Sequence, residues 1–293
     1  MGVEFKYNIV SISNFLEKRE EENEDFIDVQ SAYNNPYTRF SLCDGAGGAG
    51  VFCRDWAMHL AKSVPLNPCN FDRNTKKWFY NASKEFHDEV IEKKDLSDLI
   101  LNKKVYRDGS YSTLTACWID KMANELFFSS TGDSCVILFE KDSEEFKLKY
   151  FASMNDQDSM DESPCLLNWL IDLDKELPFH SIDVTNHFII LMASDSLAKW
   201  IILCLAMINQ DLIAPPIFKD NFLLSINNPK NMLRKEAVNF GSHNIKTLED
   251  LFEYLKKVSS AKDIFTSAMQ TLYSNQEIDI DDYSLIFIEG DVS

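Results

Sequence analysis

Residues 39–48 read RFSLCDGAGG, and no other stretch of the chain says more about its architecture. Arg39–Cys43 has the character of a strand, Asp44 follows it directly, and four small residues begin at Gly45. Small residues allow the backbone to approach an ion closely, so that a carbonyl such as that of Gly45 can act as a ligand. The same pattern also fits a plain strand-to-helix turn. A nucleotide-phosphate loop is not indicated, because the Walker lysine and the Gly-x-Gly-x-x-Gly spacing are absent.

Four other acidic motifs lie near the ends of strand-like runs: Asn23-Glu24-Asp25, Gly132-Asp133-Ser134, Ser194-Asp195-Ser196 and Asp281-Asp282-Tyr283-Ser284. Hard divalent cations need several carboxylate oxygens that converge on one point, and strand ends can bring such oxygens together from distant parts of a chain. Taken singly, each motif has an ordinary explanation as a helix cap, a solvated loop or an acidic turn. Their combination predicts a metal-dependent hydrolase of the phosphatase kind.

The composition restricts the classes of partner. The chain has 293 residues, a net charge of −18 and 45% hydrophobic residues, which is enough for a sizeable core. Such an acidic chain is a poor candidate for binding nucleic acid or an anionic membrane through a basic surface. Its seven cysteines form no Cys-x-x-Cys pair and the first residues contain no apolar signal segment, so we expect reduced thiols and a cytoplasmic location.

Strand-like and helical patterns follow each other irregularly along the chain. Strands are expected at Phe5–Ile12, Phe26–Val29, Tyr37–Cys43, Ser112–Ile119, Glu125–Ser130, Cys135–Glu140, Phe146–Phe151, His187–Ala193 and Tyr283–Glu289. Helices are expected at Gly50–Lys62, Phe71–Lys94, Leu197–Met207, Leu248–Lys257 and Ala261–Tyr273. This order favours an α+β architecture, in which helices cover antiparallel sheets. Because no linker or repeat is visible, we expect residues 1–293 to form one domain.

In their order along the chain, the motifs resemble those of the PPM-type (type 2C) metal-dependent serine/threonine protein phosphatases. That family carries Asn-Glu-Asp near the start, then Asp-Gly-x-Gly-Gly, a Gly-Ser-x-Thr-like segment, Gly-Asp-Ser, a Ser/Thr-Asp-Gly-like motif and a late Asp-Asn-x-Thr. The resemblance runs over almost the whole chain, with residues 109–113 as the Gly-Ser-x-Thr-like segment. The phrase DSLAKW at residues 195–200 is most similar to the bacterial branch of the family.

The resemblance implies a four-layer αββα sandwich, in which two central antiparallel β-sheets are flanked by helices. It also implies a cleft at one edge of the sheets that holds two Mg²⁺ or Mn²⁺ ions, with a third, weaker ion beside them. By similarity, Asp44 would bridge the first two ions, and Asp195 and Asp281 would complete the coordination of one of them. These three aspartates would therefore be the catalytic residues, acting through the metals.

The other ligands implied by the resemblance have weaker or indirect contacts. The carbonyl of Gly45 would hold the second ion, together with Glu24 and Asp25 acting through waters. Asp133 would help to hold the third ion. Two metals about 4 Å apart acidify a shared water and orient it for in-line displacement, so that no covalent enzyme intermediate is needed.

The chain departs from the family pattern at four positions. Ala46 stands where many eukaryotic members have a histidine that can protonate the leaving oxygen, and many bacterial members lack this histidine too. Glu20 stands where the family often has a phosphate-binding arginine, which makes the neighbouring Arg19 the candidate for that role. Ser196 replaces the usual glycine, and Asp282 replaces the common asparagine.

We therefore predict a phosphatase that hydrolyses phosphoserine and phosphothreonine. Two alternatives stay open: a weak or inactive pseudophosphatase with the same fold, and a phosphatase of a small phosphorylated molecule. The expected partners are a phosphorylated protein and a cognate serine/threonine kinase, and we expect a monomer that binds neither nucleic acid nor membrane. The acidic run Asp156–Glu162 is expected to be a solvated loop, or else a flap that gates the metal cleft.

Overall fold

The computed structural model describes residues 2–16, 19–48, 50–152, 164–213 and 243–293. Their strands form two five-stranded sheets and one short pair, all antiparallel. The first sheet has the order β1 (Val3–Ile12), β12 (Tyr283–Val292), β11 (Phe188–Ala193), β7 (Cys135–Asp142), β8 (Glu145–Ala152). The second has the order β10 (His180–Asp183), β6 (Glu125–Thr131), β5 (Leu114–Asp120), β3 (Tyr37–Asp44), β2 (Asp25–Ser31). The short pair is β4 (Tyr111–Ser112) and β9 (Leu167–Asn168).

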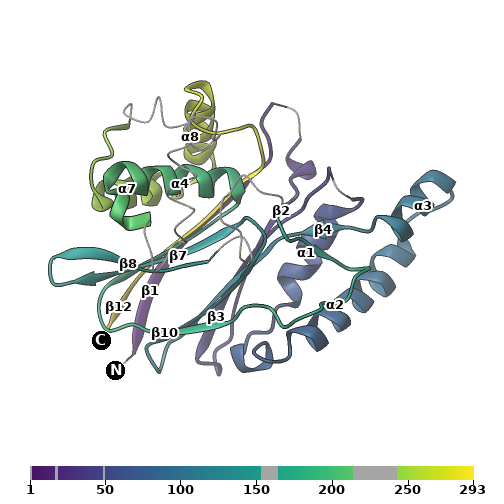
Figure 1. Cartoon of the computed structure of the whole chain (residues 1–293), viewed down its shortest axis with the longest axis horizontal. Coiled ribbons are helices and arrows are strands. Elements are labelled where there is room, and N and C mark those ends of the chain that lie inside the picture. The colour runs from purple at the N-terminus through teal and green to yellow at the C-terminus, as the bar shows by residue number, and fades with distance from the viewer. Residues whose placement is uncertain (1, 17–18, 49, 153–163, 214–242) are drawn as a thin grey trace.

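Helices cover the outer face of each sheet (Figure 1). The first sheet packs against α4 (Asp195–Ile208), α7 (Leu248–Val258) and α8 (Lys262–Ser274). The second sheet packs against α1 (Cys53–Ser63) and α2 (Thr75–Glu89), and α3 (Leu99–Arg107) continues this layer. Short 3₁₀ turns lie at Glu20–Glu22, Pro68–Asn70, Ile91–Lys93 and Gln210–Ile213. The predicted α+β architecture, with two antiparallel sheets between helices, is therefore confirmed.

The core consists of three apolar layers, one between the sheets and one beneath each set of helices. Phe40 and Leu42 of β3 pack in the layer between the sheets, together with Ile190 and Met192 of β11. Strand β11 has the continuous apolar sequence FIILMA and is buried along its whole length, as expected of a strand covered on both faces. The two sheets are therefore held together by side chains that alternate along their strands.

The strand order places the beginning of β12 next to the end of β11. β12 lies between β1 and β11, and it pairs with β1 from Val3 opposite Val292 to Ile12 opposite Tyr283. Ala193, the last residue of β11, pairs with Leu285 near the start of β12. The acidic residues that follow β11 and precede β12 therefore lie side by side at the same end of these two neighbouring strands.

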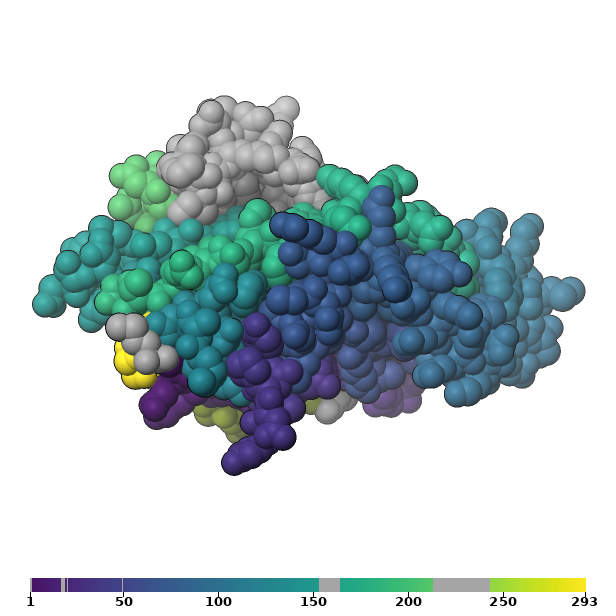
Figure 2. Space-filling model, turned by 90° about the horizontal axis from the view of Figure 1, so that it is seen from below, coloured from purple at the N-terminus to yellow at the C-terminus, as the bar shows by residue number. Residues whose placement is uncertain are grey.

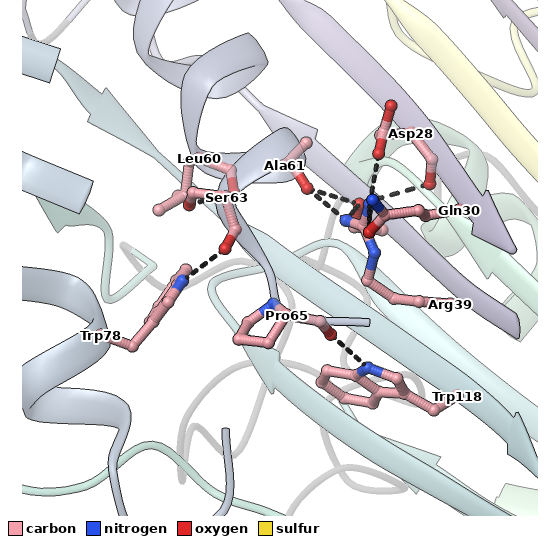
Figure 3. Close-up of polar contacts among 10 residues, drawn as sticks. Asp28, Gln30, Arg39, Leu60, Ala61, Ser63, Pro65, Trp78 and Trp118 are labelled. Atoms are coloured by element: carbon pink, nitrogen blue, oxygen red, sulfur yellow. Dashed lines mark hydrogen bonds and ion pairs between the residues drawn. The ribbon is translucent and has the colours of Figure 1, made fainter. Parts of the chain in front are cut away.

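Polar contacts fix α1 against the second sheet (Figure 3). The side chain of Arg39 on β3 is fully buried, forms an ion pair with Asp28 on β2, and donates to the carbonyl of Ala61 in the last turn of α1. The Ser41 hydroxyl donates to the same carbonyl at 2.9 Å. Just beyond, the indole of Trp78 donates to the carbonyl of Ser63 at 2.8 Å. These bonds satisfy carbonyls that the end of a helix leaves without partners, and they determine where α1 lies.

The molecule is elongated, and its two ends lie on different halves: one is part of the first sheet, and the other is part of the helical layer on the second sheet. The hairpin of β7 and β8 forms one end of the long axis, and α3 lies at the other end (Figure 2). No helix in the described ranges has the length and apolar character that crossing a membrane requires.

One predicted helix has the wrong bounds, and one helix was missed. The expected helix Phe71–Lys94 is shorter: α2 covers Thr75–Glu89, because Arg73 has a left-handed φ of 56° and a 3₁₀ turn follows the helix. Helix α3 was not predicted, because Val105 is its only buried residue and no apolar period marks it. Its start is set by the side chain of Asp98, which accepts hydrogen bonds from the N–H groups of Ile100 and Leu101.

Candidate metal centre

A cavity of about 270 Å³ lies at the edge where the two sheets bring their acidic strand ends together. Its walls contain five carboxylates from five separate segments of the chain: Glu24, Asp44, Asp133, Asp195 and Asp281. The backbone of residues 45–48 and the side chains of Thr113, Pro164 and Leu166 complete the lining. Six of the seven residues that the resemblance implied as metal ligands therefore face one space, since Gly45 also lines it.

Asp44 is the last residue of β3, and its backbone is fixed on both sides. Its N–H donates to the hydroxyl of Thr113 at 3.0 Å, and its carbonyl accepts from the N–H of Thr113 at 2.9 Å. The Thr113 hydroxyl in turn contacts that of Ser134 at 2.9 Å. Burial raises the pKa of the Asp44 carboxyl well above its usual range, and nearby carboxylates raise it further: Asp25, Asp195, Asp281 and Asp133. Such repulsion is relieved when a cation binds.

The glycine loop after Asp44 is shaped to make room for Glu24. The N–H of Gly45 donates to the carbonyl of Glu24 at 3.1 Å, and the N–H of Ala46 donates to the carbonyl of Tyr111 at 3.0 Å. A Cβ atom on Gly47 would lie 2.2 Å from Oε1 of Glu24, a distance that no real contact allows. The absence of a side chain at residue 47 therefore leaves room for the Glu24 carboxylate in its present position.

Asp195 and Asp281 come from the ends of β11 and β12. Asp195 is the first residue of α4, and its side chain accepts a hydrogen bond from the N–H of Ser196. The pKa of Asp281 is raised to about 9, first by burial and then by the charges of Asp195 and Asp25. The Asp281 carboxylate also accepts from the N–H of Asp282 at 2.9 Å. The two aspartates thus act on each other as like charges in a buried place.

Asp133 lies in the turn between β6 and β7. Burial and the charge of Asp195 raise its pKa to about 6, and Lys199 opposes this rise. The preceding Gly132 has a φ of 95°, and a Cβ there would lie 2.6 Å from Cγ2 of Thr113. Glycine is therefore needed at residue 132, because the tight turn there places the carboxylate of Asp133 at the cavity.

Asp25 is buried beside the cavity and does not line it. It is the first residue of β2 and pairs with Asp44 across the second sheet. Neither of its carboxylate oxygens has a hydrogen-bond partner in the described part of the chain. Burial, and then the charge of Asp282, raise its pKa to about 7, although the nearby hydroxyls of Ser284 and Ser194 lower it. A buried carboxyl with such weak contacts to donors is stabilised by a nearby cation or by a proton.

The residues present fit a divalent metal. The side chains converging on the cavity offer only oxygen atoms, which are the ligands preferred by Mg²⁺ and Mn²⁺. Several of these oxygens belong to carboxyls whose pKa values are raised by their neighbours, and Asp25 adds a buried carboxyl without a partner. The local excess of negative charge is the arrangement that a bound cation of charge two would neutralise.

Asp282 has a positioning role that the sequence did not indicate. Its Oδ1 accepts from the N–H of Asn14, and its Oδ2 accepts from the N–H of Glu24, both at 2.7 Å. One carboxylate therefore joins the ends of the loop between β1 and β2 to the start of β12. Asn23 adds a second link, because its side chain donates to the Ser11 hydroxyl at 2.7 Å.

Arg19 lies away from the cavity. Its side chain is 74% exposed and forms ion pairs with Glu21 and Glu22 on its own loop, at 3.3 Å each. None of the described residues that line the cavity is an arginine, a lysine or a histidine. The predicted flap at Asp156–Glu162 falls outside the described residues.

Some site residues were not found by reasoning from the sequence. Pro164 and Leu166 line the cavity from a segment that carries no acidic motif, so nothing in the sequence pointed to them. Lys199 follows Asp195 by four residues on α4, and its Nζ lies 3.8 Å from Asp195 Oδ2. That spacing was visible in the sequence, because residues four apart are neighbours on a helix.

No protein-family model and no curated protein matches the chain. Among solved structures, the serine/threonine phosphatase Stp1 from Staphylococcus aureus is 12% identical, with a TM-score of 0.50 over 100% of this chain and 96% of that one. The serine/threonine phosphatase of S. agalactiae is 13% identical, with a TM-score of 0.49 over 97% and 99% of the two chains. The catalytic domain of the phosphatase PstP, solved with two manganese ions, is 13% identical, with a TM-score of 0.49 over 99% and 100%. The likeness to Stp1 establishes the fold as that of PPM-type phosphatases, which confirms the predicted architecture.

Proposed function

We propose that this chain is a metal-dependent protein phosphatase that hydrolyses phosphoserine and phosphothreonine. One observation carries the proposal: five carboxylates from five separate segments line a single cavity whose side-chain donors are all oxygens. Oxygen ligands at such a density suit Mg²⁺ or Mn²⁺, and a pair of these ions is a common device for phosphate-ester hydrolysis.

The proposed ligands divide into direct and indirect ones. Asp44 would contact two ions, and Asp195 and Asp281 would complete the coordination of one of these ions. The carbonyl of Gly45 would contact the second ion, and Glu24 and the buried Asp25 would act through water. When bound, the ions supply positive charge that acidifies a water and stabilises the charge developing on a transferred phosphoryl group.

The remaining residues of the site hold these carboxylates in place. Thr113 fixes the backbone of Asp44 through two hydrogen bonds. Asp282 fixes the backbone of Glu24, and Gly47 leaves the space that the Glu24 side chain occupies. Pro164 and Leu166 give the cavity an apolar side, which excludes water from part of the site. Rigid support of this kind is what precise metal placement needs.

The cysteines near the cavity do not favour a thiolate mechanism. Cys53 lies beside the glycine loop, where its Sγ donates to the carbonyl of Ala46 at 3.2 Å. Burial raises the pKa of Cys53 to about 11, and it raises the pKa of the buried Cys43 as well. A nucleophilic cysteine needs a lowered pKa, so neither thiol is suited to act as the nucleophile. This agrees with the proposal that water attacks the phosphate directly.

A catalytically weak regulatory domain is the second candidate. Ala46 cannot donate a proton, and no basic side chain lines the cavity in the described residues. In this alternative the fold binds metal and a partner protein and turns over slowly. For the active enzyme, we infer a phosphorylated protein as substrate, a serine/threonine kinase as its counterpart, and a monomer in the cytoplasm.

The test is hydrolysis of p-nitrophenyl phosphate and of a phosphothreonine peptide in Mn²⁺, with and without EDTA. Asp44→Asn and Asp195→Asn keep the side-chain shape and remove a charge. Asp142→Asn is the matched control, because Asp142 is an exposed aspartate paired with Lys147 in the β7–β8 hairpin. We expect metal-dependent turnover that falls by at least a hundredfold in the first two variants and is unchanged in the third.

The other outcomes separate the alternatives. A folded wild type that binds Mn²⁺ without turnover would support the regulatory domain. Turnover of p-nitrophenyl phosphate and of small phosphate esters, with none of the peptide, would indicate a small-molecule phosphatase. Turnover that persists in EDTA and in Asp44→Asn would contradict the metal mechanism.

A further inference from the structure

Lys199 is a cation placed against the carboxylates of the metal centre. It lies on α4, one turn after Asp195, and its Nζ is 3.8 Å from Asp195 Oδ2. The Lys199 side chain is 17% exposed, and that of Asp195 is 19% exposed. Water therefore screens this pair less than an ion pair on the protein surface.

The same ammonium acts on a second carboxylate. The positive charge of Lys199 lowers the pKa of Asp133, against burial and against the charge of Asp195, which raise it. Asp133 and Asp195 come from different segments, the β6–β7 turn and the start of α4, and both line the cavity. Lys199 is thus paired with Asp195 and also acts on the charge of Asp133, and both of these carboxylates line the cavity.

The position of Lys199 argues against a direct contact with substrate. It is not among the described residues that line the cavity, although its partner Asp195 is. Lys199 therefore acts on the cavity through the charge of the carboxylates beside it, Asp195 and Asp133.

We propose that Lys199 is a built-in counter-cation for Asp133 and Asp195, which keeps a divalent ion away from that end of the cavity. The chain would then bind two divalent ions at the ligands proposed above, Asp195 among them, where the resemblance to the family suggested a third. This inference rests on the proposed metal centre and deepens it. An ammonium paired with Asp195 and acting on the charge of Asp133 offsets part of their negative charge and repels a further cation.

The test is a calorimetric titration of the full chain with Mn²⁺ alone. We compare the wild type with Lys199→Met, which keeps most of the length and removes the charge, and with Lys199→Arg, which keeps the charge. We expect two ions per chain in the wild type and in Lys199→Arg, and three in Lys199→Met. The added site should be lost again in the double variant Lys199→Met with Asp133→Asn.

A matched control is Lys147→Met, which breaks a lysine–aspartate pair in the β7–β8 hairpin, distant from the cavity. It should bind two ions. Circular dichroism and thermal unfolding identify any variant that does not fold, and Lys199→Gln replaces the methionine variant in that event. Because stoichiometry is read directly, the result does not depend on catalytic turnover.

Two results would overturn the proposal: three ions in the wild type, or an unchanged number and affinity of ions in Lys199→Met. A wild type that binds no Mn²⁺ contradicts the proposed function instead. The comparison still tests the role of Lys199 in that case. If Lys199→Met binds an ion that the wild type does not bind, the proposal is supported; if it binds none, the proposal is overturned.

Discussion

The carboxylate of Asp282 accepts a hydrogen bond at 2.7 Å from the backbone N–H of Glu24, a residue 258 positions earlier in the chain. A second bond of the same length reaches the N–H of Asn14. Asp282 therefore connects the loop that presents Glu24 to the strand that follows Asp281. It controls the shape of the metal centre without lining the cavity.

Replacing Asp282 by alanine should weaken both the fold and metal binding. A buried N–H that loses its acceptor costs about 1–3 kcal/mol; the N–H of Asn14 is buried and that of Glu24 is only partly buried, so we expect the free energy of unfolding to fall by about 2 to 4 kcal/mol. Asp282→Asn keeps one acceptor oxygen and should lose about half as much. Urea unfolding and Mn²⁺ titration measure the two effects. Equal stability of all three proteins would contradict this role.

Gly47→Ala should displace Glu24. The new Cβ would lie 2.2 Å from Glu24 Oε1, so the carboxylate must rotate out of its place. We expect the Kd for Mn²⁺ to rise by about tenfold, in line with the loss of a supporting group at a metal site. Gly48→Ala is the control, because no heavy atom lies within 4 Å of the Cβ that it would add. Similar affinities for the two variants would argue against a role for Glu24.

The metal-free protein should lose stability as the pH rises. The pKa values of Asp25 and Asp281 are raised in the folded chain to about 7 and about 9, from the ordinary aspartate value of 3.8. The folded state then binds more protons than the unfolded state, so stability is complete below about pH 4, declines above it, and the loss from each group is finished once the pH has passed its folded pKa. In EDTA, we expect the free energy of unfolding to drop by at least about 2 kcal/mol between about pH 6 and pH 9.

Two comparisons check the origin of this pH dependence. Saturating Mn²⁺ should remove most of the slope, because bound cations stabilise the ionised carboxylates. Asp25→Asn removes one of the buried charges, so it should stabilise the metal-free protein at about pH 8 while weakening Mn²⁺ binding. A slope that is the same with Mn²⁺ and in Asp25→Asn would assign it to groups outside the site.

Arg39→Met should destabilise the fold strongly. The buried guanidinium pairs with Asp28 and binds the carbonyl of Ala61, and both partners would be left without it. Removing one member of a buried ion pair costs about 3–5 kcal/mol, and the partial exposure of Asp28 points to the lower value. Arg54→Met on the exposed side of α1 is the control and should change stability by less than about 0.5 kcal/mol. Denaturant unfolding distinguishes the two.

Most strands were predictable because their signals are local, whereas the short β9 and β10 were missed. β11 is a continuous apolar run followed by an acidic motif, β12 contains the apolar run LIFI after another such motif, and β3 ends at the Asp44 motif. The predicted bounds of most strands differ from the observed ones by a few residues. Helix α3 could not be predicted in this way, since its Leu99 and Ile100 are exposed and only Val105 and Leu101 pack against the core.

The convergence of the carboxylates depends on information that no single motif holds. Asp195 and Asp281 meet because β12 inserts beside β11, a consequence of sheet topology and not of spacing. The hydrogen bonds of Asp282 and the lining by Pro164 also arise from segments that meet only after folding. The position of Arg19 beside the first motif led us to predict that it binds phosphate in the cavity. Its side chain instead forms ion pairs with neighbours on its own loop.

The insertion of β12 between β1 and β11 has a consequence for the way the protein is made. While a ribosome is still synthesising the chain, β1 lacks its partner in the first sheet until β12, the last strand of this sequence, has been made. The same late segment carries Asp281 and Asp282. A nascent chain therefore has no complete cavity until nearly all of this sequence has left the exit tunnel, and a premature stop before residue 281 yields a product that lacks both of these carboxylates.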